Sequence, residues 1–346
     1  MCVSVLYENI LSDAAIKDKA KKIIKMTAMK YSIITPVYNR EDCIARCLES
    51  VVRNLKPGIE IEHIVVDDGS HDKTTEVVRE YAKRYKHILF VQFPENRGTN
   101  AARNAAIKAA KGDFCILLDS DDYFVDDAVG FINSIVSASR YKAYMFAPDD
   151  MVEYYSGNYL LSGKYSVRLS FSNFLRNELG GDFIHCISTE ILKNNLFDEK
   201  LRVFEAVFFL MFFKEAQTML FTNRVVTIRE RSRGDSVTRT MIASNKETIK
   251  KYYQANHLRY RWFLEDYIQL GEFNSLTTLL NGQLYYSLLL QKRDKAIEWR
   301  NELKKRNLPI NTKNQILFKL RLGGTLLLSF KFYFALKYKI LKSKLS

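Results

Sequence analysis

The feature of this sequence that most constrains its fold is a short apolar run that ends in three carboxylates, Phe114-Cys-Ile-Leu-Leu-Asp-Ser-Asp-Asp122. Five consecutive apolar residues of mostly β-prone types predict a strand that is buried on both faces. Carboxylates at the C-terminal end of such a strand lie where open α/β sheets bind their ligands. Because crowded acidic groups raise one another's pKa unless a cation shares them, the cluster favours a hard divalent ion such as Mg²⁺ or Mn²⁺. The structural alternative is that Ser120 or Asp122 caps a following helix.

Strand and helix signals alternate over the first third of the chain. Strands are predicted at 31–35, where Pro36 stops the run, and at 61–66, 88–93 and 114–118. Helices are predicted between them: an amphipathic one at 43–52, one that Ser70 or Asp72 caps and that ends at residue 84, and an alanine-rich one at 100–110. This alternation implies βαβ units and therefore an α/β fold with a mainly parallel sheet flanked by helices.

The remainder of the chain changes character near residue 240. Residues 130–235 are less regular and rich in aromatics, and long helical patterns follow at 252–270, 276–290 and 294–305. We therefore predict three parts. They are an N-terminal helical extension at 1–28, an α/β domain at 29–240 and a helical C-terminal region at 241–346.

The charge of the chain points to acidic partners. Its 346 residues carry a formal net charge of +14, which suits phosphates or an anionic surface. The tail Lys313–Ser346 has eight Lys or Arg and no acidic residue, and its apolar residues cluster as one face. This basic amphipathic pattern favours an anionic membrane surface over nucleic acid, and we expect no nucleic-acid partner. An ordinary basic helix packed on the domain is the alternative.

The cysteines and the N-terminal sequence indicate a cytoplasmic protein. Together with the basic tail, they predict a peripheral protein on the cytoplasmic face of the membrane. The five cysteines form no CxxC pair and predict buried thiols in a reducing compartment; they are Cys2, Cys43, Cys47, Cys115 and Cys186. Cys43 and Cys47 are expected to be core thiols of one helix rather than metal ligands. Residues 1–28 lack the apolar stretch of a secretory signal, and no run reaches the roughly 20 apolar residues of a transmembrane helix.

A second acidic strand end lies close to the first in the expected sheet. Asp68 follows the strand at 61–66, so in a doubly wound sheet it faces the same edge as Asp119–Asp122. One acidic group can accept hydrogen bonds from a base or a ribose, and the other can hold a metal against a diphosphate. Tyr38 and Glu41 leave the first strand at this same edge, where Tyr38 can stack on a base.

Four phrases carry a resemblance to a known family. They are Ser32-Ile-Ile-Thr-Pro-Val-Tyr-Asn39, Val65-Val-Asp-Asp-Gly-Ser70, Asn96-Arg-Gly98 with Ala102-Arg-Asn104, and Leu118-Asp-Ser-Asp-Asp122. In this order they resemble the signatures of the family-two inverting glycosyltransferases, which have the GT-A fold, and the resemblance covers about residues 29–240. It implies metal-dependent transfer of a sugar, with inversion, from a nucleotide-sugar such as a UDP-sugar to a glycan or lipid-linked acceptor.

The resemblance also implies roles for individual residues. Pro36, Tyr38 and Glu41 would line the nucleoside pocket, and Asp68 would meet the base, often uracil. Asp121 would bind Mn²⁺ or Mg²⁺ as the second acidic residue of a DxD-type motif. The full set of donor-binding residues implied in this way is Pro36, Tyr38, Glu41, Asp68, Arg97, Arg103, Asp119, Asp122 and, in a late loop at 229–239, Arg233.

The position that departs from the family pattern is the catalytic base. After a phrase like Phe197-Asp-Glu-Lys-Leu201, the family carries a Glu-Asp pair whose Asp deprotonates the acceptor, but here the pair reads Glu205-Ala206. Because alanine cannot accept a proton, either Glu205 takes this role or another carboxylate such as Asp182 does. The alternative is a donor-binding, catalytically impaired partner protein in glycan assembly. His185 lies in a segment that often meets the acceptor, although a lone histidine is more often structural.

Overall fold

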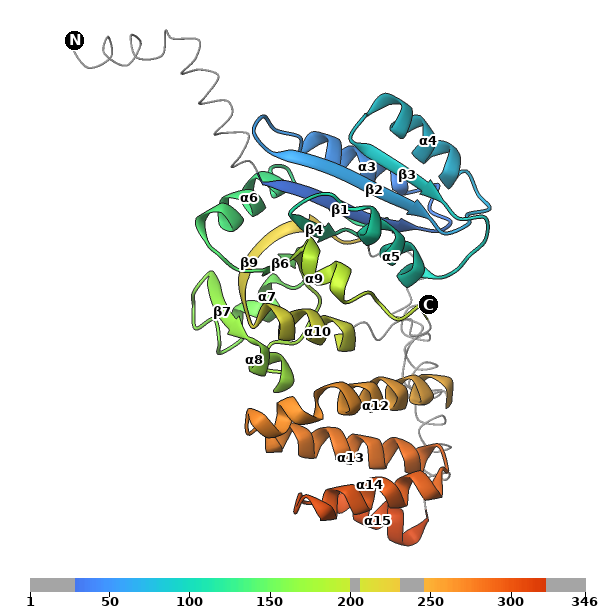
Figure 1. Cartoon of the computed structure of the whole chain (residues 1–346), viewed down its shortest axis with the longest axis vertical. Helices are drawn as coiled ribbons and strands as arrows, with labels where there is room; N and C mark the ends of the chain where they lie inside the picture. The colour runs from blue at the N-terminus through green and yellow to red at the C-terminus, as the bar shows by residue number, and fades with distance from the viewer. Residues whose placement is uncertain (1–28, 200–205, 231–245, 322–346) are drawn as a thin grey trace, which may run out of the picture. The chain divides into compact units, whose positions relative to one another are not determined.

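Nine strands within the described residues form one mixed sheet (Figure 1). The computed structural model describes residues 29–199, 206–230 and 246–321, so the predictions for the extension at 1–28 and for the tail beyond 321 lie outside the described residues. The strands are β1 (Lys30–Val37), β2 (Glu60–Asp67), β3 (Ile88–Gln92), β4 (Phe114–Leu117), β5 (Tyr123–Phe124), β6 (Ala143–Pro148), β7 (Ser166–Ser170), β8 (Ile184–Ser188) and β9 (Thr218–Ile228). They lie in the order β3-β2-β1-β4-β8-β6-β9-β5, and β7 pairs with β9.

Most of these strands run in the same direction, which confirms the mainly parallel sheet. β1 is parallel to β2 and β4, β2 is parallel to β3, and β6 is parallel to β9. Only β8 and β5 are antiparallel to the neighbours with which their pairing is described. Residues 31–37 of β1 are all buried, as expected for a central strand covered on both faces.

The chain reverses its course across the sheet beside β1. β1, β2 and β3 follow one another outward, and β4 then returns to the other side of β1. The connections contain α3 (Ile44–Arg53), α4 (Thr74–Arg84) and α5 (Thr99–Ala109). Because crossovers are right-handed, the reversal places α3 and α4 on one face and α5 on the other, as Figure 1 shows. The carboxyl ends of β1, β2 and β4 therefore meet at a topological switch point, where doubly wound sheets bind ligands.

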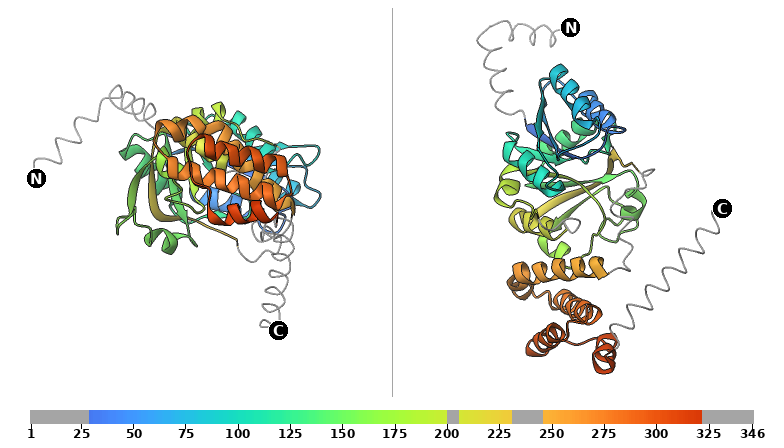
Figure 2. Two further views of the ribbon diagram at one scale, coloured as in Figure 1. Left: turned by 90° about the horizontal axis from the view of Figure 1, so that it is seen from below. Right: turned by 90° about the vertical axis from the view of Figure 1, so that its right-hand side faces the viewer.

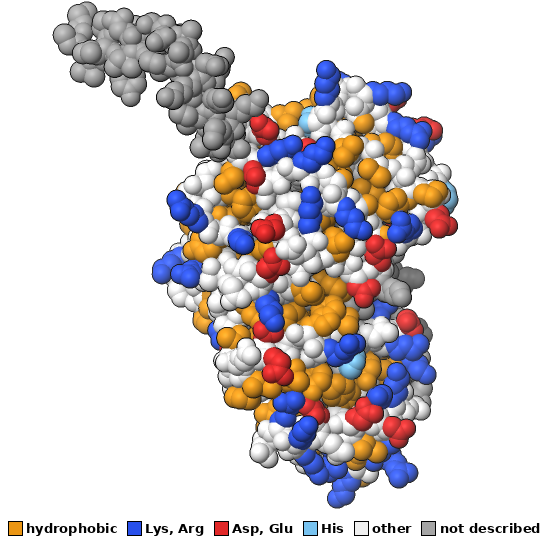
Figure 3. All heavy atoms as spheres, viewed as in Figure 1, with side chains coloured by type: hydrophobic (Ala, Val, Ile, Leu, Met, Phe, Trp, Pro, Cys, Tyr) orange, Lys and Arg blue, Asp and Glu red, His pale blue; other side chains and the backbone are white. Residues whose placement is uncertain are grey.

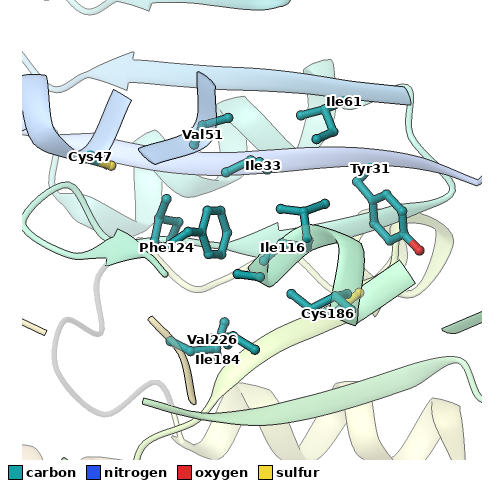
Figure 4. Close-up of a cluster of buried hydrophobic side chains, with 14 of the residues drawn as sticks. Tyr31, Ile33, Cys47, Val51, Ile61, Ile116, Phe124, Ile184, Cys186 and Val226 are labelled. Atoms are coloured by element: carbon teal, nitrogen blue, oxygen red, sulfur yellow. The ribbon is translucent and has the colours of Figure 1, made fainter. Parts of the chain in front are cut away.

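One hydrophobic core joins the two halves of the sheet (Figure 4). The buried stripe of α3 consists of Ile44, Cys47, Leu48 and Val51, at the spacing that predicted an amphipathic helix. The same cluster contains Ile33 of β1, Ile116 of β4, Phe124 of β5, Cys186 of β8 and Val226 of β9. Because it extends from β1 to β9, this core holds the strand ends of both halves in fixed relation.

β1 is longer than predicted and continues through Pro36, which lies opposite Val66 of β2. The prediction that Pro36 ends the strand is therefore wrong. The amide of Leu118 donates to the carbonyl of Ile34, and β4 pairs with β1 no further than this residue. Pro36 follows Ile34 by two residues, so its backbone nitrogen also faces β4. Because the β1–β4 ladder has already ended there, the absence of an N–H on Pro36 removes no hydrogen bond between these strands.

The described residues divide into two compact units. The first holds the sheet and comprises residues 29–169, 181–199 and 215–230, and it also contains α6 (Ala128–Ala138), α7 (Val152–Ser156) and α9 (Thr189–Asn194). The second comprises residues 170–180, 206–214 and 246–321. The helical unit thus takes in two segments from before residue 240.

The second unit consists of helices. They are α8 (Phe171–Leu175), most of α10 (Ala206–Ala216), α12 (Lys246–Gln269), α13 (Phe273–Leu289), α14 (Arg293–Lys305) and α15 (Thr312–Leu320). Of these, α12, α13 and α14 pack on one another in succession (Figures 1 and 2). The rings of Phe174 and Phe213 lie 4.2 Å apart and join α8 to α10. Arg259 of α12 donates to the carbonyl of Leu175 at 2.8 Å. The three long helices predicted after residue 250 are confirmed as α12, α13 and α14.

Charged side chains of both signs are mixed on the face of the molecule in Figure 3. The positive charge of the chain is therefore not gathered into one patch on that face. Among the helices in the described part of the chain, none combines the length and the apolar character needed to cross a bilayer.

Candidate active site

The loops that follow β1 and β2 are tied together by hydrogen bonds. The amide of Asn39 donates to Ser70 Oγ (2.9 Å), and the amide of Glu41 donates to Asp72 Oδ2 (3.1 Å). In the other direction, the amide of Lys73 donates to Glu41 Oε2 (2.9 Å). These reciprocal bonds satisfy backbone groups that leave the sheet and make the two strand ends one edge.

The three residues predicted to line a nucleoside pocket lie on this edge. Pro36 is buried within β1, and Glu41 is exposed in the loop that follows. Tyr38 is 36% exposed, and its ring meets the ring of His71 edge to face at 6.5 Å. An exposed aromatic ring beside a strand end is a surface on which a base can stack. The structure brings these three residues together, and their contact with a nucleoside stays a prediction.

Asp68, directly after β2, holds the turn that begins α5. The side chain is buried, and Oδ1 accepts the amide of Arg97 at 2.7 Å while Oδ2 accepts that of Gly98 at 2.8 Å. Bonds from backbone amides to a carboxylate are charge-assisted and strong. Gly69 makes the close approach possible, because a Cβ at this position would lie 2.5 Å from the carbonyl carbon of Glu95. A base contact by Asp68, which has further lone pairs, stays a prediction.

The acidic run after β4 forms a tight turn. The amide of Asp122 donates to the carbonyl of Asp119 at 3.1 Å. The strand β5 follows at once, and the next helix, α6, begins only at Ala128. The alternative that Ser120 or Asp122 caps a following helix is therefore wrong.

Two thiols of α3 hold the backbone of this turn. Cys47 Sγ donates to the carbonyl of Asp119, and Cys43 Sγ donates to that of Ser120, each at 3.8 Å. Both thiols are buried and form no disulfide within the described residues, and the same holds for Cys115 and Cys186, which confirms the predicted core thiols; Cys2 lies outside the described residues.

Two arginines approach the carboxylates of the run. Arg103 Nη2, from α5, lies 2.7 Å from Asp119 Oδ1. Arg40 Nε, from the loop after β1, lies 3.7 Å from Asp121 Oδ2. The structure thus joins the predicted residues Arg103 and Asp119 directly and adds Arg40 to the site.

Asp122 is the most buried carboxylate of the run. Its Oδ1 accepts the amide of Glu230 at 3.2 Å, and Arg46 Nη2 lies 2.6 Å from Glu230 Oε2. Burial, followed by the charges of Asp119 and Asp121, raises the pKa of Asp122 to about 8. Three carboxylates therefore repel one another at this strand end, which is the electrostatic condition under which a cation binds favourably.

The donor atoms of this cluster fit a hard divalent cation. They are carboxylate oxygens at the end of a strand, and the pKa of Asp122 is raised by burial and then by the charges of Asp119 and Asp121, a repulsion that a cation would relieve. Within the described residues, no three side chains of ligand-forming type converge closely enough to hold a metal unaided. Mg²⁺ is commonly held by one or two carboxylates together with substrate phosphates, and Asp121 suits that role.

A second charged cluster surrounds Arg229, directly after β9. Its Nε and Nη2 donate to the two carboxylate oxygens of Asp150 (2.8 and 2.5 Å), and its Nη1 donates to Asp182 Oδ2 (2.6 Å). Its backbone amide donates to Asp149 Oδ1 at 3.1 Å. Although partial burial opposes the charge, the bonds to Asp150 and Asp182 raise the pKa of Arg229. Since β4, β6 and β9 run in the same direction, this cluster lies at the same edge of the sheet as the acidic run.

The other predicted residues have separate positions. The guanidinium of Arg97 lies over the ring of Phe93 at 4.8 Å and 3.4 Å from a carboxylate oxygen of Glu199. His185 is buried, and burial, with the nearby charge of Arg103, lowers its pKa to about 3, so the ring is neutral. Glu205 and Arg233 lie outside the described residues.

Sequence reasoning missed several residues that build this edge. Arg40 stands in the Tyr38-Asn-Arg-Glu phrase, and Arg229 begins the predicted late loop, so motif position could have singled out both. Asp149 and Asp150 follow β6 as Asp68 follows β2. The rule that carboxylates at parallel strand ends mark a site, applied to β6, would have found them.

The segment from β1 to α6 matches a known family. Residues 32–138 match the model described as Glycosyl transferase family 2. The poly(ribitol-phosphate) beta-glucosyltransferase of Bacillus spizizenii is 42% identical over 102 residues, which are 29% of this chain and 16% of that relative. The alignment therefore spans about a sixth of the relative's length. Over residues 32–138 the chain is thus similar to the family 2 glycosyltransferases, in agreement with the resemblance seen in its sequence.

Solved structures of glycosyltransferases share the fold. TarS residues 1–349 from Staphylococcus aureus, in complex with UDP-GlcNAc, align with a TM-score of 0.56 and 18% identity over 82% of this chain and 93% of that one. The mannosyltransferase PcManGT from Pyrobaculum calidifontis, in complex with GDP-Man and Mn²⁺, aligns with a TM-score of 0.51 and 16% identity over 88% and 86%. At these identities the likeness concerns the fold, and it confirms the predicted GT-A type.

Proposed function

We propose that this protein transfers a sugar, with inversion, from a nucleotide-sugar donor of the UDP-sugar type to a glycan or lipid-linked acceptor. The observation that carries the proposal is the arrangement at the switch point. Asp68 after β2 and the run Asp119–Asp122 after β4 flank β1, and Tyr38 leaves β1 between them. This is the place and the chemistry for a nucleotide with its base at one side and its diphosphate at the other. Support comes from the related fold of TarS, whose structure contains UDP-GlcNAc.

In the proposed complex the base lies against Tyr38 and Asp68, and the diphosphate lies at Asp119 and Asp121. Asp121 holds Mn²⁺ or Mg²⁺, which would supply positive charge against the diphosphate as it leaves. The presence of Mn²⁺ in the PcManGT structure supports this part of the proposal. Arg103 keeps Asp119 oriented through its 2.7 Å ion pair.

The acceptor that we propose to test first is poly(ribitol phosphate). This polymer appears in the name of the B. spizizenii relative, which is 42% identical to this chain over 102 residues. A polymer of this kind is long, rich in hydroxyls and negatively charged, so the chain's formal net charge of +14 would favour its approach. The basic tail, of which residues 322–346 lie outside the described residues, would hold the protein on an anionic membrane surface on the cytoplasmic face.

A second function is favoured by one observation, the alanine at position 206. If no other carboxylate replaces the family's base, the chain binds its donor and serves as a partner protein in glycan assembly. A positioned base contributes roughly 10²–10⁴-fold to the rate, so its loss would leave donor binding intact and transfer very slow.

Nucleotide release separates the two functions. The protein is incubated with Mn²⁺, poly(ribitol phosphate) and, in turn, UDP-glucose, UDP-GlcNAc and GDP-mannose, and UDP binding is measured by calorimetry in parallel. Transfer predicts acceptor-dependent release from a UDP-sugar, abolished in Asp121→Ala. Binding of UDP without release from any donor would favour the partner protein.

A further inference from the structure

We propose that Asp182 is the carboxylate that takes the proton from the acceptor hydroxyl, in place of the base that Ala206 cannot supply. The inference rests on the proposed transfer function and assigns a further catalytic residue to that site. Three observations carry it: the position of Asp182 in the sheet, its connection to the donor cluster, by which we mean the run Asp119–Asp122, and the exposure of its carboxylate.

The topology places Asp182 at the edge where the donor cluster lies. β8 runs antiparallel to β4, and Cys186 is paired with Ile116. Asp182 precedes Cys186 by four residues, and Ser120 follows Ile116 by four. Since the strands are neighbours that run in opposite directions, both positions lie beyond the same end of the β4–β8 ladder. Asp182 is therefore at the carboxyl end of β4, beside the acidic run.

Arg229 connects Asp182 to the donor cluster. Its Nη1 donates to Asp182 Oδ2 at 2.6 Å, and the amide of the next residue, Glu230, donates to Asp122 Oδ1 at 3.2 Å. One side chain and one peptide unit therefore separate Asp182 from Asp122, the most buried carboxylate of the acidic run.

The carboxylate of Asp182 is held at one oxygen and open at the other. Its side chain is 69% exposed, compared with 24% for Asp150. Arg229 engages both oxygens of Asp150, whereas in the described part of the chain it engages Asp182 only through Oδ2. The backbone at this point is fixed as well, because Tyr155 Oη donates to the carbonyl of Asp182 at 2.5 Å. An oriented carboxylate with a free oxygen toward solvent is the geometry of a general base.

The proposed step balances as a single displacement. The acceptor oxygen forms a bond to the anomeric carbon of the donor sugar while its proton passes to Oδ1 of Asp182. The bond from that carbon to the diphosphate oxygen breaks, and its electron pair leaves with the nucleoside diphosphate. Arg229 keeps the carboxylate in place throughout and so acts as a positioning residue.

The test compares Asp182→Ala with Asp150→Ala, which also removes a partner of Arg229. Each variant of the full chain is assayed for acceptor-dependent UDP release with Mn²⁺ and poly(ribitol phosphate), with and without added sodium formate. UDP affinity is measured by calorimetry for each. We expect Asp182→Ala to lose about 10²–10⁴-fold in kcat, to regain at least tenfold with formate, and to bind UDP within about twofold of the wild type. In Asp150→Ala, formate restores nothing.

Other results overturn the proposal. Full activity of Asp182→Ala, together with loss of activity in Glu205→Gln, would assign the base to Glu205. An Asp182→Ala variant that is slow but gains nothing from formate would reduce Asp182 to a structural partner of Arg229. If the wild type itself binds UDP and releases none from any donor, the proposed transfer function fails. This failure is distinguishable from a wrong assignment of the base, because no variant then differs in activity from the wild type.

Discussion

Asp68 Oδ2 accepts the backbone amide of Gly98 at 2.8 Å, so a buried carboxylate at the end of β2 fixes the residue that caps α5. The other oxygen of the same carboxylate accepts the amide of Arg97. The turn after β3 is thereby fastened to the end of β2, at the edge where the proposed donor lies. Positioning of this turn is a structural role of Asp68 that the motif alone did not indicate.

The first prediction concerns the substitution Asp68→Asn. The asparagine amide group would face a backbone N–H where an oxygen now accepts it, and the charge that strengthens both bonds would be lost. We expect a loss of about 2–3 kcal/mol in the free energy of unfolding, measured with urea, and at least about tenfold weaker UDP binding. Asp113→Asn is the control, since Asp113 accepts the amide of Lys30 at the opposite edge of the sheet. It should lower stability without changing UDP affinity.

The second prediction concerns Gly69→Ala. Gly69 has a φ of 72°, and a Cβ there would meet the backbone of Glu95 at 2.5 Å. Both the backbone strain and the displaced turn should cost stability, about 2–4 kcal/mol in the free energy of unfolding. Gly163→Ala separates the two causes, because Gly163 has a φ of 79° and a Cβ there would meet no atom of the described residues within 4 Å. Equal losses in the two variants would show that contact with Glu95 contributes nothing.

The third prediction concerns Arg40 and the affinity for metal. Arg40 Nε lies 3.7 Å from Asp121 Oδ2, so its charge competes with a cation for that carboxylate. Arg40→Gln should bind Mn²⁺ about three- to tenfold more tightly than the wild type in calorimetry, and Arg40→Lys, which keeps the charge, should stay close to the wild type. Unchanged Mn²⁺ affinity in Arg40→Gln would mean that Arg40 does not oppose metal binding.

The fourth prediction concerns stability in mild acid. His63 is fully buried in β2, its Nε2 lies 2.9 Å from Thr35 Oγ1, and burial lowers its pKa to about 3. The unfolded chain, with a histidine pKa of about 6.5, binds the proton first. The contribution of His63 to the free energy of unfolding therefore falls as the pH drops below about 6.5, by up to about 1.4 kcal/mol per pH unit.

Urea unfolding at about pH 7.5 and about pH 5 tests this effect. Other groups also change the stability over this range. His185, whose pKa is lowered to the same value, adds a similar loss, whereas the raised pKa of Asp122 acts in the opposite direction because the folded chain keeps that proton. The effect of His63 is therefore read as a difference, and between the two pH values His63→Gln should lose about 2 kcal/mol less stability than the wild type. His71→Gln, in the exposed loop after β2, is the control for the substitution itself. Equal changes in His63→Gln and in the wild type would contradict the account.

The sequence could predict the centre of the donor side because Tyr38, Asp68 and the run Asp119–Asp122 each follow a strand of the β1–β4 half. There the order of elements in the chain and their order in space are related by simple βαβ rules. The exception was Pro36, where the usual effect of proline on a strand did not apply because β4 stops pairing with β1 at Ile34.

The acceptor side could not be predicted in the same way. Asp150 follows β6, Asp182 precedes β8, and Arg229 follows β9. These strands lie in the order β8-β6-β9 in the sheet. β8, an antiparallel strand between the parallel strands β4 and β6, brings Asp182 close to Arg229 and Asp150. These three residues are 32 to 79 positions apart, so no short sequence motif could have predicted their contact. Arg229 was recognised as part of a basic loop, but its three carboxylate partners were visible only in the fold.

The most direct test of the central claim is a crystal structure with UDP and Mn²⁺, in which the metal is located by its anomalous scattering. The account predicts the uracil beside Tyr38 and Asp68, and the Mn²⁺ between the diphosphate and Asp121. A nucleotide bound elsewhere on the chain, or a Mn²⁺ with no contact to the run Asp119–Asp122, would contradict it.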